Sequence, residues 1–488
     1  MFVHSKFTQA LGASRVSHSA SQSDFVQSVL FQGVFDKDVD VKFDAPHQSS
    51  DGGALLLGGL DHTLGLSQVL VNSIWDVRQK AKVEHDLIEM VRFRIYQICC
   101  GYVDLNDAAT LRNDPLFIFL SDFNRDFHDR PLASPATLCR LENSVSPREL
   151  LRMGHKLMDW QLEHQRRIRS NQRVRTITID LDPTDNPAYG QQQFIQFNSH
   201  YDNYVYLPLL AFVTFHDEHG MEEAEQFLVG SVLRSGSAGA SDCARGVLRR
   251  LIAKLRDLFP GVAIRVRLDG GFAAPYMFKF LEEQRVKYLV NMGPNSVLRT
   301  LAEPLMIQAR ELVQQSGQSS RVYGEILYQA GTWDAPRRVI VKAEVLLHEL
   351  HGTKDNSRFV ITNYSEAADP ERLYAHTYCV RGDVENRIKE LHEMGLSRTS
   401  CGSFWANQFR VHLVTAAYML IQELRRRAVG TKLERAQVGT LRGALLKIGA
   451  TVRELTRKLY VSLPDTAVFA GIWCAIAKGL GGVPLMQT

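Results

Sequence analysis

One change in hydrophobic period constrains the fold of this chain more than any other feature. From about residue 50 to 165, apolar residues recur every three to four positions, as in "EHDLIEMVRFRIYQICCGY", which is typical of helices. From Val174 onward the period becomes two. Ile177, Ile179 and Leu181 lie on one face of a strand, and Thr178, Asp180 and Asp182 lie on the other. The chain therefore predicts a helical region followed by an α/β region.

Four further strand candidates follow the first, and helical segments separate the later ones. They cover residues 204–215, 226–233, 262–269 and 286–292. The order β-β-β-α-β-α-β, a meander followed by right-handed crossovers, is that of the ribonuclease H fold. We predict an α/β protein with a mixed five-stranded sheet and helices. Three more strand-like runs between residues 295 and 375 predict a β-rich insertion.

Three carboxylates follow these elements at positions that can converge. Asp182 ends the first strand, Asp269 ends the fourth, and Glu385 lies in the first turns of the later helix "RGDVENRIKELHEMG". Mg²⁺ takes few carboxylates and leaves positions for water and phosphate oxygens. A two-metal site of this kind activates a water or a 3′-hydroxyl. Singly, each acid also fits a turn or an ordinary helix pair, and Asp180 shares the strand face of Asp182 as an alternative first acid.

The charge distribution suits a polyanionic partner. The net charge is +4, but residues 421–488 hold eleven Lys/Arg and four Asp/Glu, and "QRRIRSNQRVR" precedes the first strand. Basic segments that flank an acidic site favour binding to nucleic acid, although solvated helix faces also carry such clusters. No apolar run is long enough to span a membrane. Seven scattered cysteines without a C-x-x-C pair indicate a reducing cytoplasm.

The chain resembles the DDE transposases of bacterial insertion sequences, specifically insertion-sequence group thirteen-eighty. The resemblance is carried by "DLDPTDNPAYGQQ", "YDNYVYLPLLAF", "RLDGGFAAP", "YLVNMGPN", "YCVRGDVENRIKEL" and "FWANQFRVHL". Segments resembling that group's terminal regions include "LASPATLCRLEN" and "VGTLRGALLKIGATVRELTRKLYVSLP". Together these segments extend over nearly the whole chain after residue 45.

The resemblance implies a ribonuclease H-like catalytic domain whose β-strand insertion lies between the second and third acids. It implies Mg²⁺-dependent cleavage at terminal inverted repeats and strand transfer into target DNA, with two ions that Mn²⁺ can replace. The family's acids fall on Asp182, Asp269 and Glu385, and these three are the expected catalytic and metal-binding residues. Asp182 stands in an Asp-x-Thr context with Thr184.

A broader transposase signature also falls on the helix of Glu385. Tyr378, Arg381 and Glu385 keep its Tyr-x₂-Arg-x₃-Glu spacing, but His392 stands where the signature has a lysine, and Lys389 comes three positions earlier. Tyr378, Arg381 and Lys389 are expected to bind phosphates or DNA on this ground. From the basic C-terminal segment, Arg453, Arg457 and Lys458 are expected to do the same.

The predicted organisation has five parts. They are a poorly ordered tail (1–45), a helical DNA-binding domain (46–165), a ribonuclease H-like catalytic domain (170–294 and 376–424), a β-strand insertion domain (295–375) and a basic helical C-terminal region (425–488). The expected partner is double-stranded DNA, at terminal inverted repeats and at the target. Because two ends must be synapsed, a homodimer on the DNA is expected, in the bacterial cytoplasm at the nucleoid and without a membrane.

Two other functions share these residues. A ribonuclease H-fold nuclease or resolvase would cut without joining, and a DNA-binding regulator would keep the fold with a non-functional catalytic site. The presence of all three acids disfavours the regulator. Phe404 and Trp405 suit either stacking on an unpaired base or core packing, and core packing is favoured.

Overall fold

The computed structural model describes residues 28–123, 130–217, 225–348, 352–456 and 458–483, in two compact units. The first unit, Met1–Gln48, contains an antiparallel hairpin of β1 (Ser28–Phe31) and β2 (Val39–Lys42). Of the predicted poorly ordered tail over 1–45, residues 1–27 lie outside the described part, and the exposed hairpin follows them. Short strand β3 (Gln48–Ser49) marks the junction with the second unit, Ser49–Thr488.

Helices form the first part of the second unit, as the three-to-four spacing predicts. Serine and aspartate caps fix where several of them begin: Ser134 and Ser146 each precede a proline at the first helical position, and Ser146 forms a capping box with Glu149. The helices are α1 (Leu55–Leu64), α2 (Leu66–Val71), α3 (Leu87–Cys99), α4 (Ala108–Leu111), α5 (Pro115–Ser121), α6 (Pro135–Ser144) and α7 (Pro147–Ile168), with 3₁₀ turns η1 (Gly52–Ala54), η2 (Lys80–Lys82) and η3 (Leu105–Asp107).

A mixed eight-stranded sheet follows, in the order β12-β13-β14-β11-β10-β4-β8-β9. Its central strands β4, β10 and β11 are parallel, while β8 and β9 are antiparallel to their neighbours. The predicted first and fourth strands are thus adjacent. These five strands are β4 (Thr176–Pro183), β8 (Leu209–His216), β9 (Phe227–Val232), β10 (Ala263–Leu268) and β11 (Lys287–Met292); a small sheet beside them holds β5 (Asn186–Pro187), β6 (Gln196–Asn198) and β7 (Asn203–Tyr206).

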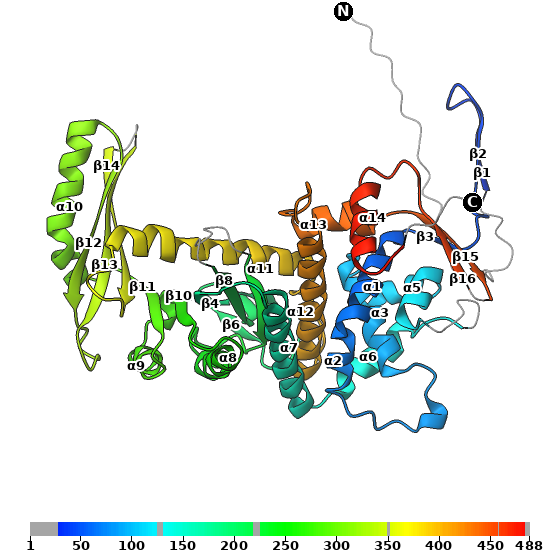
Figure 1. Cartoon of the computed structure of the whole chain (residues 1–488), viewed down its shortest axis with the longest axis horizontal. Coiled ribbons are helices and arrows are strands. Elements are labelled where there is room, and N and C mark those ends of the chain that lie inside the picture. The colour runs from blue at the N-terminus through cyan, green and yellow to red at the C-terminus, as the bar shows by residue number, and fades with distance from the viewer. Residues whose placement is uncertain (1–27, 124–129, 218–224, 349–351, 457, 484–488) are drawn as a thin grey trace, which may run out of the picture. The chain divides into compact units, whose positions relative to one another are not determined.

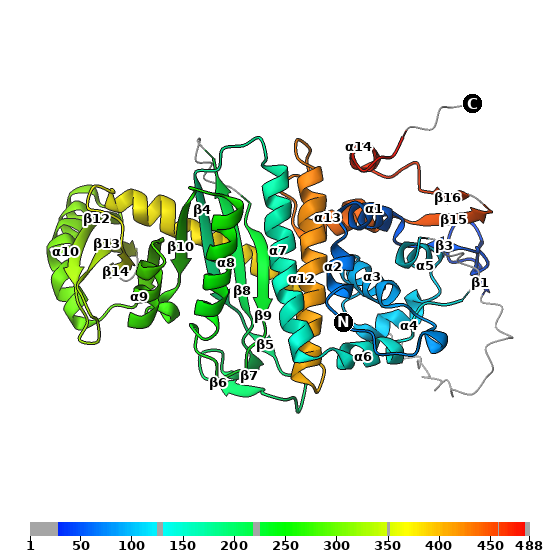
Figure 2. The same cartoon turned by 60° about the horizontal axis from the view of Figure 1, so that its bottom comes forward.

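Helices cover both faces of this sheet. The apolar face of β4 packs against α8 (Ala244–Leu258), which Figure 2 shows in front of the sheet with α7 beside it. Helix α9 (Pro275–Glu283) and the 3₁₀ turn η4 (Gly270–Phe272) connect β10 to β11. Helix α12 (Phe404–Arg427) is buried along nearly its whole length because it packs on β9, α7 and α3, between the sheet and the N-terminal helices (Figure 1).

Side chains of α12 close the edge of the sheet at β9. Gln408 Oε1 accepts a hydrogen bond from the backbone N–H of Leu233 at 2.7 Å, and Gln422 accepts one from Leu228 at 3.2 Å. Gln422 Nε2 also donates to the carbonyl of Gln226 at 2.8 Å. Buried backbone groups at a sheet edge need such partners, so this edge is satisfied by a helix instead of by another strand.

The predicted β-rich insertion is present but is continuous with the central sheet. Strands β12 (Ser320–Tyr328), β13 (Arg337–His348) and β14 (Gly352–Thr362) form antiparallel pairs, and Phe359–Thr362 of β14 pairs with Leu289–Met292 of β11. The predicted sheet of five strands is thus smaller than the observed sheet of eight strands. Helix α10 (Ser296–Ser316) covers one face of the added strands (Figure 1).

The chain then passes through a π-helical segment η5 (Arg372–Tyr378), a 3₁₀ turn η6 (Cys379–Gly382) and α11 (Asp383–Glu393) before α12. After α12 come α13 (Val438–Leu441), η7 (Arg442–Leu446), β15 (Ala450–Leu455), β16 (Lys458–Ser462) and α14 (Ala470–Gly479). The expected basic helical C-terminal region contains α13 and α14 but also β15 and β16, which form an antiparallel hairpin whose exposure alternates along β15. No helix in the described ranges is long and apolar enough to cross a membrane.

An ion pair between β4 and β10 lies in the middle of this fold. Asp180 and Arg267 are opposite each other in the parallel register, are 0% and 2% exposed, and form two charge-assisted hydrogen bonds of 2.8 and 2.7 Å. The remaining Nη1 of Arg267 donates to the carbonyl of Thr377 at 2.8 Å, which fixes η5 to the sheet. A bidentate pair of this kind stays charged in a core only while both partners are present.

We predict that Asp180→Asn lowers the free energy of unfolding by about 3–5 kcal/mol, because it leaves the Arg267 charge buried without its partner. The double variant Asp180→Leu/Arg267→Met should regain most of that loss, since an apolar pair of similar volume replaces the ions. Urea unfolding followed by circular dichroism measures both. A single variant as stable as wild type would show that the pair is dispensable.

Candidate active site

Two of the predicted acids lie side by side where the parallel strands end. Asp182 lies near the end of β4 and Asp269 directly follows β10, and these strands are hydrogen-bonded neighbours. The Asp182 side chain is 13% exposed and the Asp269 side chain is 31% exposed, so both reach the surface from a largely buried edge. One oxygen of Asp269 accepts a hydrogen bond of 2.7 Å from the N–H of Gly271, which holds the carboxylate at the turn.

Arg381 joins the two carboxylates. Its Nη2 lies 2.9 Å from Oδ1 of Asp182 and 3.7 Å from Oδ2 of Asp269, so the two acids share one positive charge. The Arg381 side chain is 14% exposed, and its Nε and Nη2 are buried without an aligned hydrogen bond. Charge attraction, more than directed hydrogen bonding, therefore holds the guanidinium here, and its unused donors can bind an anionic oxygen.

Burial and charge shift the pKa of Asp182. Desolvation raises it, Arg381 lowers it, and the negative charge of Asp269 raises it again, with the result that the pKa reaches about 7. A carboxylate that is costly to ionise beside a second carboxylate is a site where a cation relieves electrostatic strain. Asp182 and Asp269 present hard oxygen donors, and Mg²⁺ is commonly held by one or two carboxylates. The residues present thus fit a divalent cation.

Two tyrosines lie within the electric field of these acids. Burial raises the pKa of Tyr378 to about 12, and Arg381, Asp269 and Asp182 act on the same hydroxyl. Burial likewise raises the pKa of Tyr201, with contributions from Asp182 and Asp269. Sequence reasoning selected Tyr378 but missed Tyr201. Tyr201 lies in the turn between β6 and β7, next to Asp202, whose φ is 50°. A positive φ is unusual for a residue other than glycine, but the sequence pattern does not show it.

Glu385 is not part of this cluster. Its side chain is exposed on α11, as is that of Lys389, and neither makes a hydrogen bond or ion pair with any described residue. Within the described part of the chain, no three His, Cys, Asp or Glu side chains come together as a metal site. The structure therefore brings together Asp182, Asp269, Arg381 and Tyr378, and leaves Glu385 and Lys389 facing solvent.

His392, which stands where the signature has a lysine, has a packing role. His392 Nε2 lies 2.9 Å from the hydroxyl of Thr184, and Asn186 donates to the carbonyl of Leu396 at 2.8 Å. These contacts dock the end of α11 on the segment that follows Asp182. His392 is thus an anchor between two site elements, and Thr184 of the Asp-x-Thr context is its partner.

Asp180 has a different environment from Asp182. Both of its oxygens are used by Arg267, and Gln226 approaches one of them at 3.3 Å. An acid already neutralised in the core has no free oxygen for a metal ion. We therefore keep Asp182 as the proposed first acid in preference to Asp180.

The expected basic residues near the C-terminus lie on the β15–β16 hairpin. Arg453 and Lys458 are exposed, and their charged groups lie 5.0 and 4.9 Å from the centre of the Tyr460 ring. Arg457 lies outside the described residues. The hairpin thus presents two cations around one aromatic ring, a combination suited to a phosphate backbone.

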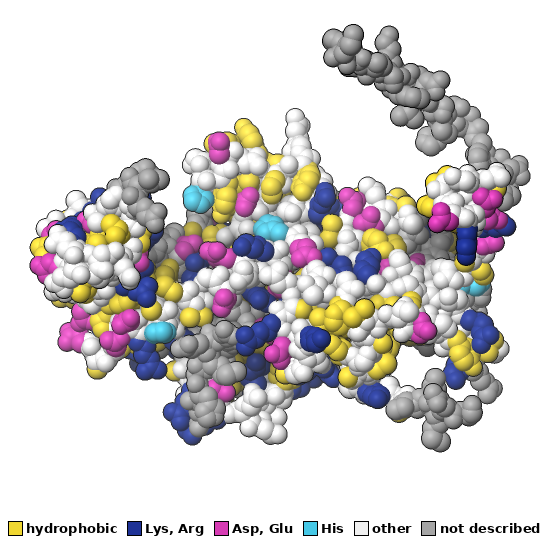
Figure 3. All heavy atoms as spheres, turned by 90° about the horizontal axis from the view of Figure 1, so that it is seen from above, with side chains coloured by type: hydrophobic (Ala, Val, Ile, Leu, Met, Phe, Trp, Pro, Cys, Tyr) yellow, Lys and Arg dark blue, Asp and Glu magenta, His cyan; other side chains and the backbone are white. Residues whose placement is uncertain are grey.

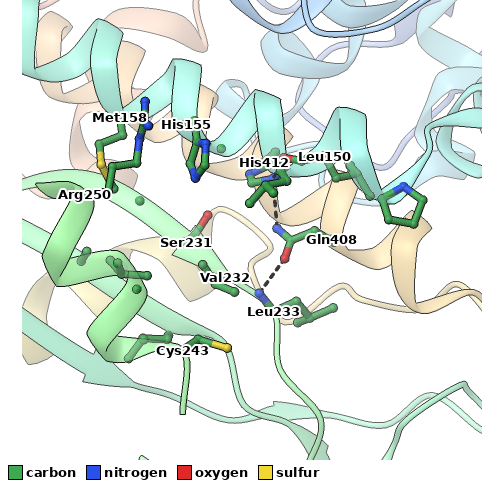
Figure 4. A pocket seen from close by; sticks show the side chains of 18 of the residues that line it. Leu150, His155, Met158, Ser231, Val232, Leu233, Cys243, Arg250, Gln408 and His412 are labelled. Atoms are coloured by element: carbon green, nitrogen blue, oxygen red, sulfur yellow. Dashed lines mark hydrogen bonds between the residues drawn. The ribbon is translucent and has the colours of Figure 1, made fainter. Parts of the chain in front are cut away.

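A cavity of about 530 Å³ lies away from the carboxylates, between α7, α8, β9 and α12 (Figure 4). Its lining is mainly apolar and also includes the polar side chains of His155, Ser231, Gln408 and His412. Trp405 lines it and is 41% exposed, whereas Phe404 is 8% exposed and packs edge-on against Phe194 and Tyr206. The favoured core role is confirmed for Phe404.

Residues 31–482 match the family model described as "Transposase DDE domain group 1". The comparison with curated proteins finds no match. The family match extends over nearly the whole chain and includes every element that builds the carboxylate site.

The raised pKa of Asp182 predicts a pH-dependent stability. The folded pKa of about 7 exceeds the ordinary value of 3.8, so the contribution of Asp182 to the unfolding free energy is fully present below about pH 4 and is lost as the pH rises through about 7. At about 1.4 kcal/mol per pKa unit, the loss should be about 2–4 kcal/mol. Asp182→Asn should remove most of it and be more stable than wild type at pH 8 without metal, as measured by chemical denaturation. Identical pH profiles of the two proteins would contradict this.

Proposed function

We propose, from the premise that the chain belongs to the transposase DDE domain group 1 family, that it cleaves DNA at the terminal inverted repeats of an insertion sequence and joins the ends to target DNA. The observation that carries the proposal is the pair Asp182 and Asp269, which share Arg381 at the ends of two neighbouring parallel strands. The order of the strands around this pair supports a ribonuclease H-like catalytic domain.

Asp182 and Asp269 are the residues that would hold Mg²⁺, and Mn²⁺ should substitute for it. When bound, the metal activates the attacking water or 3′-hydroxyl and stabilises the leaving oxygen. Two carboxylates suffice for one ion. A second ion needs a third acid, and Glu385, which is exposed on α11 apart from the pair, is the proposed donor.

Arg381 and Tyr378 are the proposed contacts of the reacting phosphate. Arg381 already lies between the two acids, and its buried Nε and Nη2 have no aligned acceptor. A phosphate oxygen beside the carboxylates would give these donors an acceptor. Lys389 lies four residues after Glu385 on α11, so the two share a helix face that is open to DNA.

The N-terminal helices and the β15–β16 hairpin are the proposed DNA-binding parts outside the catalytic domain. Since strand transfer of an element needs both of its ends, two copies of the chain are proposed to assemble on the DNA. A nuclease that cuts without joining shares the same acids, and its products distinguish it.

We predict that Asp269→Asn reduces cleavage at least about 100-fold while the fold is kept, because the amide oxygen still accepts from Gly271 but no longer binds Mg²⁺ well. The assay uses a plasmid carrying the reading frame with its native flanking DNA, with Mg²⁺ and gel analysis of cleaved and joined products. Mg²⁺ should also raise the melting temperature of wild type at pH 8 and leave that of the variant unchanged. Full activity of a folded Asp269→Asn protein would refute the metal-ligand role. Wild-type products that are cut but never joined would favour the nuclease.

A second prediction concerns the hairpin. Arg453→Gln/Lys458→Gln should flatten the salt dependence of DNA binding, with a slope smaller by about 0.9 for each phosphate that the variant no longer neutralises. Lys279→Gln/Arg285→Gln is the matched control, since it removes the same charges from exposed positions on α9 and in the turn that follows it. Fluorescence anisotropy with a labelled duplex between 50 and 200 mM salt measures both. Equal slopes in the three proteins would show that the hairpin charges face solvent and do not contact DNA phosphates.

A further inference from the structure

Part of the insertion sheet projects beyond the edge that carries the acids. Strand β14 pairs with β11 only through Phe359–Thr362, and its partner for Phe359 is Met292, the last residue of β11. Residues 352–358 of β14 therefore continue past the ends of β11, β10 and β4, on the order of 20 Å at about 3.3 Å per residue. Strands β12 and β13 pair along this projection.

The two faces of the projection differ. One face carries Val341, Ala343 and Val345, which pack under α10. On the other face, Ile340 and Val360 pack with Leu373 and Tyr374 of η5 near the base of the strands. Beyond that contact the second face, called the open face below, carries the set Arg321, Tyr323, Lys342, Glu344, Lys354, Asn356 and Arg358, of which Arg321, Lys354 and Arg358 are exposed.

This open face is on the side from which Arg381 reaches the acids. The rings of Tyr323, Tyr374 and Tyr378 form a chain with centroid separations of 5.8 and 6.1 Å, and Arg381 follows Tyr378 by three residues. Arg321 and Lys342 lie close enough to Cys379 to lower the pKa of its thiol, which burial raises. The base of the open face therefore lies next to the segment that carries Tyr378 and Arg381.

The open face carries four cations and one carboxylate, Glu344, which lies in the electric field of both Lys342 and Arg321. Lys342 pairs with Glu344 at 2.7 Å, and Asn356 donates to the same carboxylate. Arg321, Lys354 and Arg358 are exposed and make no ion pair or hydrogen bond within the described residues. On the face drawn in Figure 3, Lys and Arg side chains lie among Asp and Glu side chains.

We propose that the cationic face formed by Arg321, Lys354 and Arg358 binds the phosphate backbone of duplex DNA that continues beyond the phosphodiester held at Asp182 and Asp269. The inference rests on the proposed function, and names the surface that receives the DNA outside the reacting group. Duplex DNA carries one charge per about 1.7 Å of axis, so a projection of about 20 Å faces roughly ten phosphates. Contacts of arginine and lysine with the backbone position DNA without reading its sequence.

The test compares Lys354→Gln/Arg358→Gln with the control Lys279→Gln/Arg285→Gln in the full chain. Each variant removes one lysine and one arginine from exposed positions, and Lys279 and Arg285 lie outside the cationic face. The probe is a fluorescein-labelled 40-bp duplex of arbitrary sequence, titrated in EDTA so that no cleavage occurs. Fluorescence anisotropy between 50 and 200 mM KCl gives the affinity and its salt dependence.

The test variant should bind about five- to tenfold more weakly at 100 mM KCl, with a salt slope smaller by about 1.8, while the control stays within about twofold of wild type. Arg321→Gln alone should lower the slope by about 0.9. An unchanged slope in the test variant, or an equal decrease in the control, would overturn the proposal.

The plasmid assay distinguishes a failure of this inference from a failure of the proposed function on which it rests. If wild type cleaves the plasmid and the salt slope of the test variant is unchanged, the surface is wrong and the function stands. If the slope falls as expected but wild type never cleaves in Mg²⁺, the surface stands and the function is wrong. A wild-type chain that binds no duplex at any salt concentration would overturn both.

Discussion

The buried pair Asp180–Arg267 is the interaction on which the active site depends. It ties β4 to β10 one pleat before Asp182 and Asp269, so it fixes the relative height of the two acids at the sheet edge. Its third bond, from Arg267 to the carbonyl of Thr377, holds the segment that presents Tyr378 and Arg381. One guanidinium in the core thereby sets the position of a second guanidinium at the surface.

Arg381 offsets part of the negative charge of the two acids in the site. Two carboxylates at one edge repel each other, and the raised pKa of Asp182 reflects both that repulsion and burial. The guanidinium that lies against both acids reduces the repulsion, yet keeps donors without aligned acceptors. The same side chain can therefore serve the folded protein and contact a substrate phosphate.

Several features of the fold follow directly from sequence periodicity, and others do not. The order of β4, β8, β9, β10 and β11 is recoverable because alternating runs and helices follow one another in a standard order. The union of the insertion with the sheet rests on pairing between Leu289 and Thr362, a long-range contact that local patterns do not encode.

In the candidate active site, too, some residues could be predicted from the sequence and others could not. Asp182 and Asp269 were accessible to sequence reasoning because each follows a buried strand. Asp180 and Arg267 stand two residues before them, so a parallel register would have predicted their pairing, but the pattern alone placed Asp180 among candidate ligands. The exposed position of Glu385 depends on how η5 and η6 lead into α11, and no spacing rule determines such a junction.

The closure of β9 by α12 has a consequence for self-association. With Gln408 and Gln422 bonded to backbone groups of one outer strand, β12 is the other outer strand of the sheet in the described part of the chain. This strand carries the exposed charges Arg321 and Glu325, which disfavour stacking of identical chains edge to edge. The two outer strands are thus protected in different ways, one by helix side chains and the other by charge.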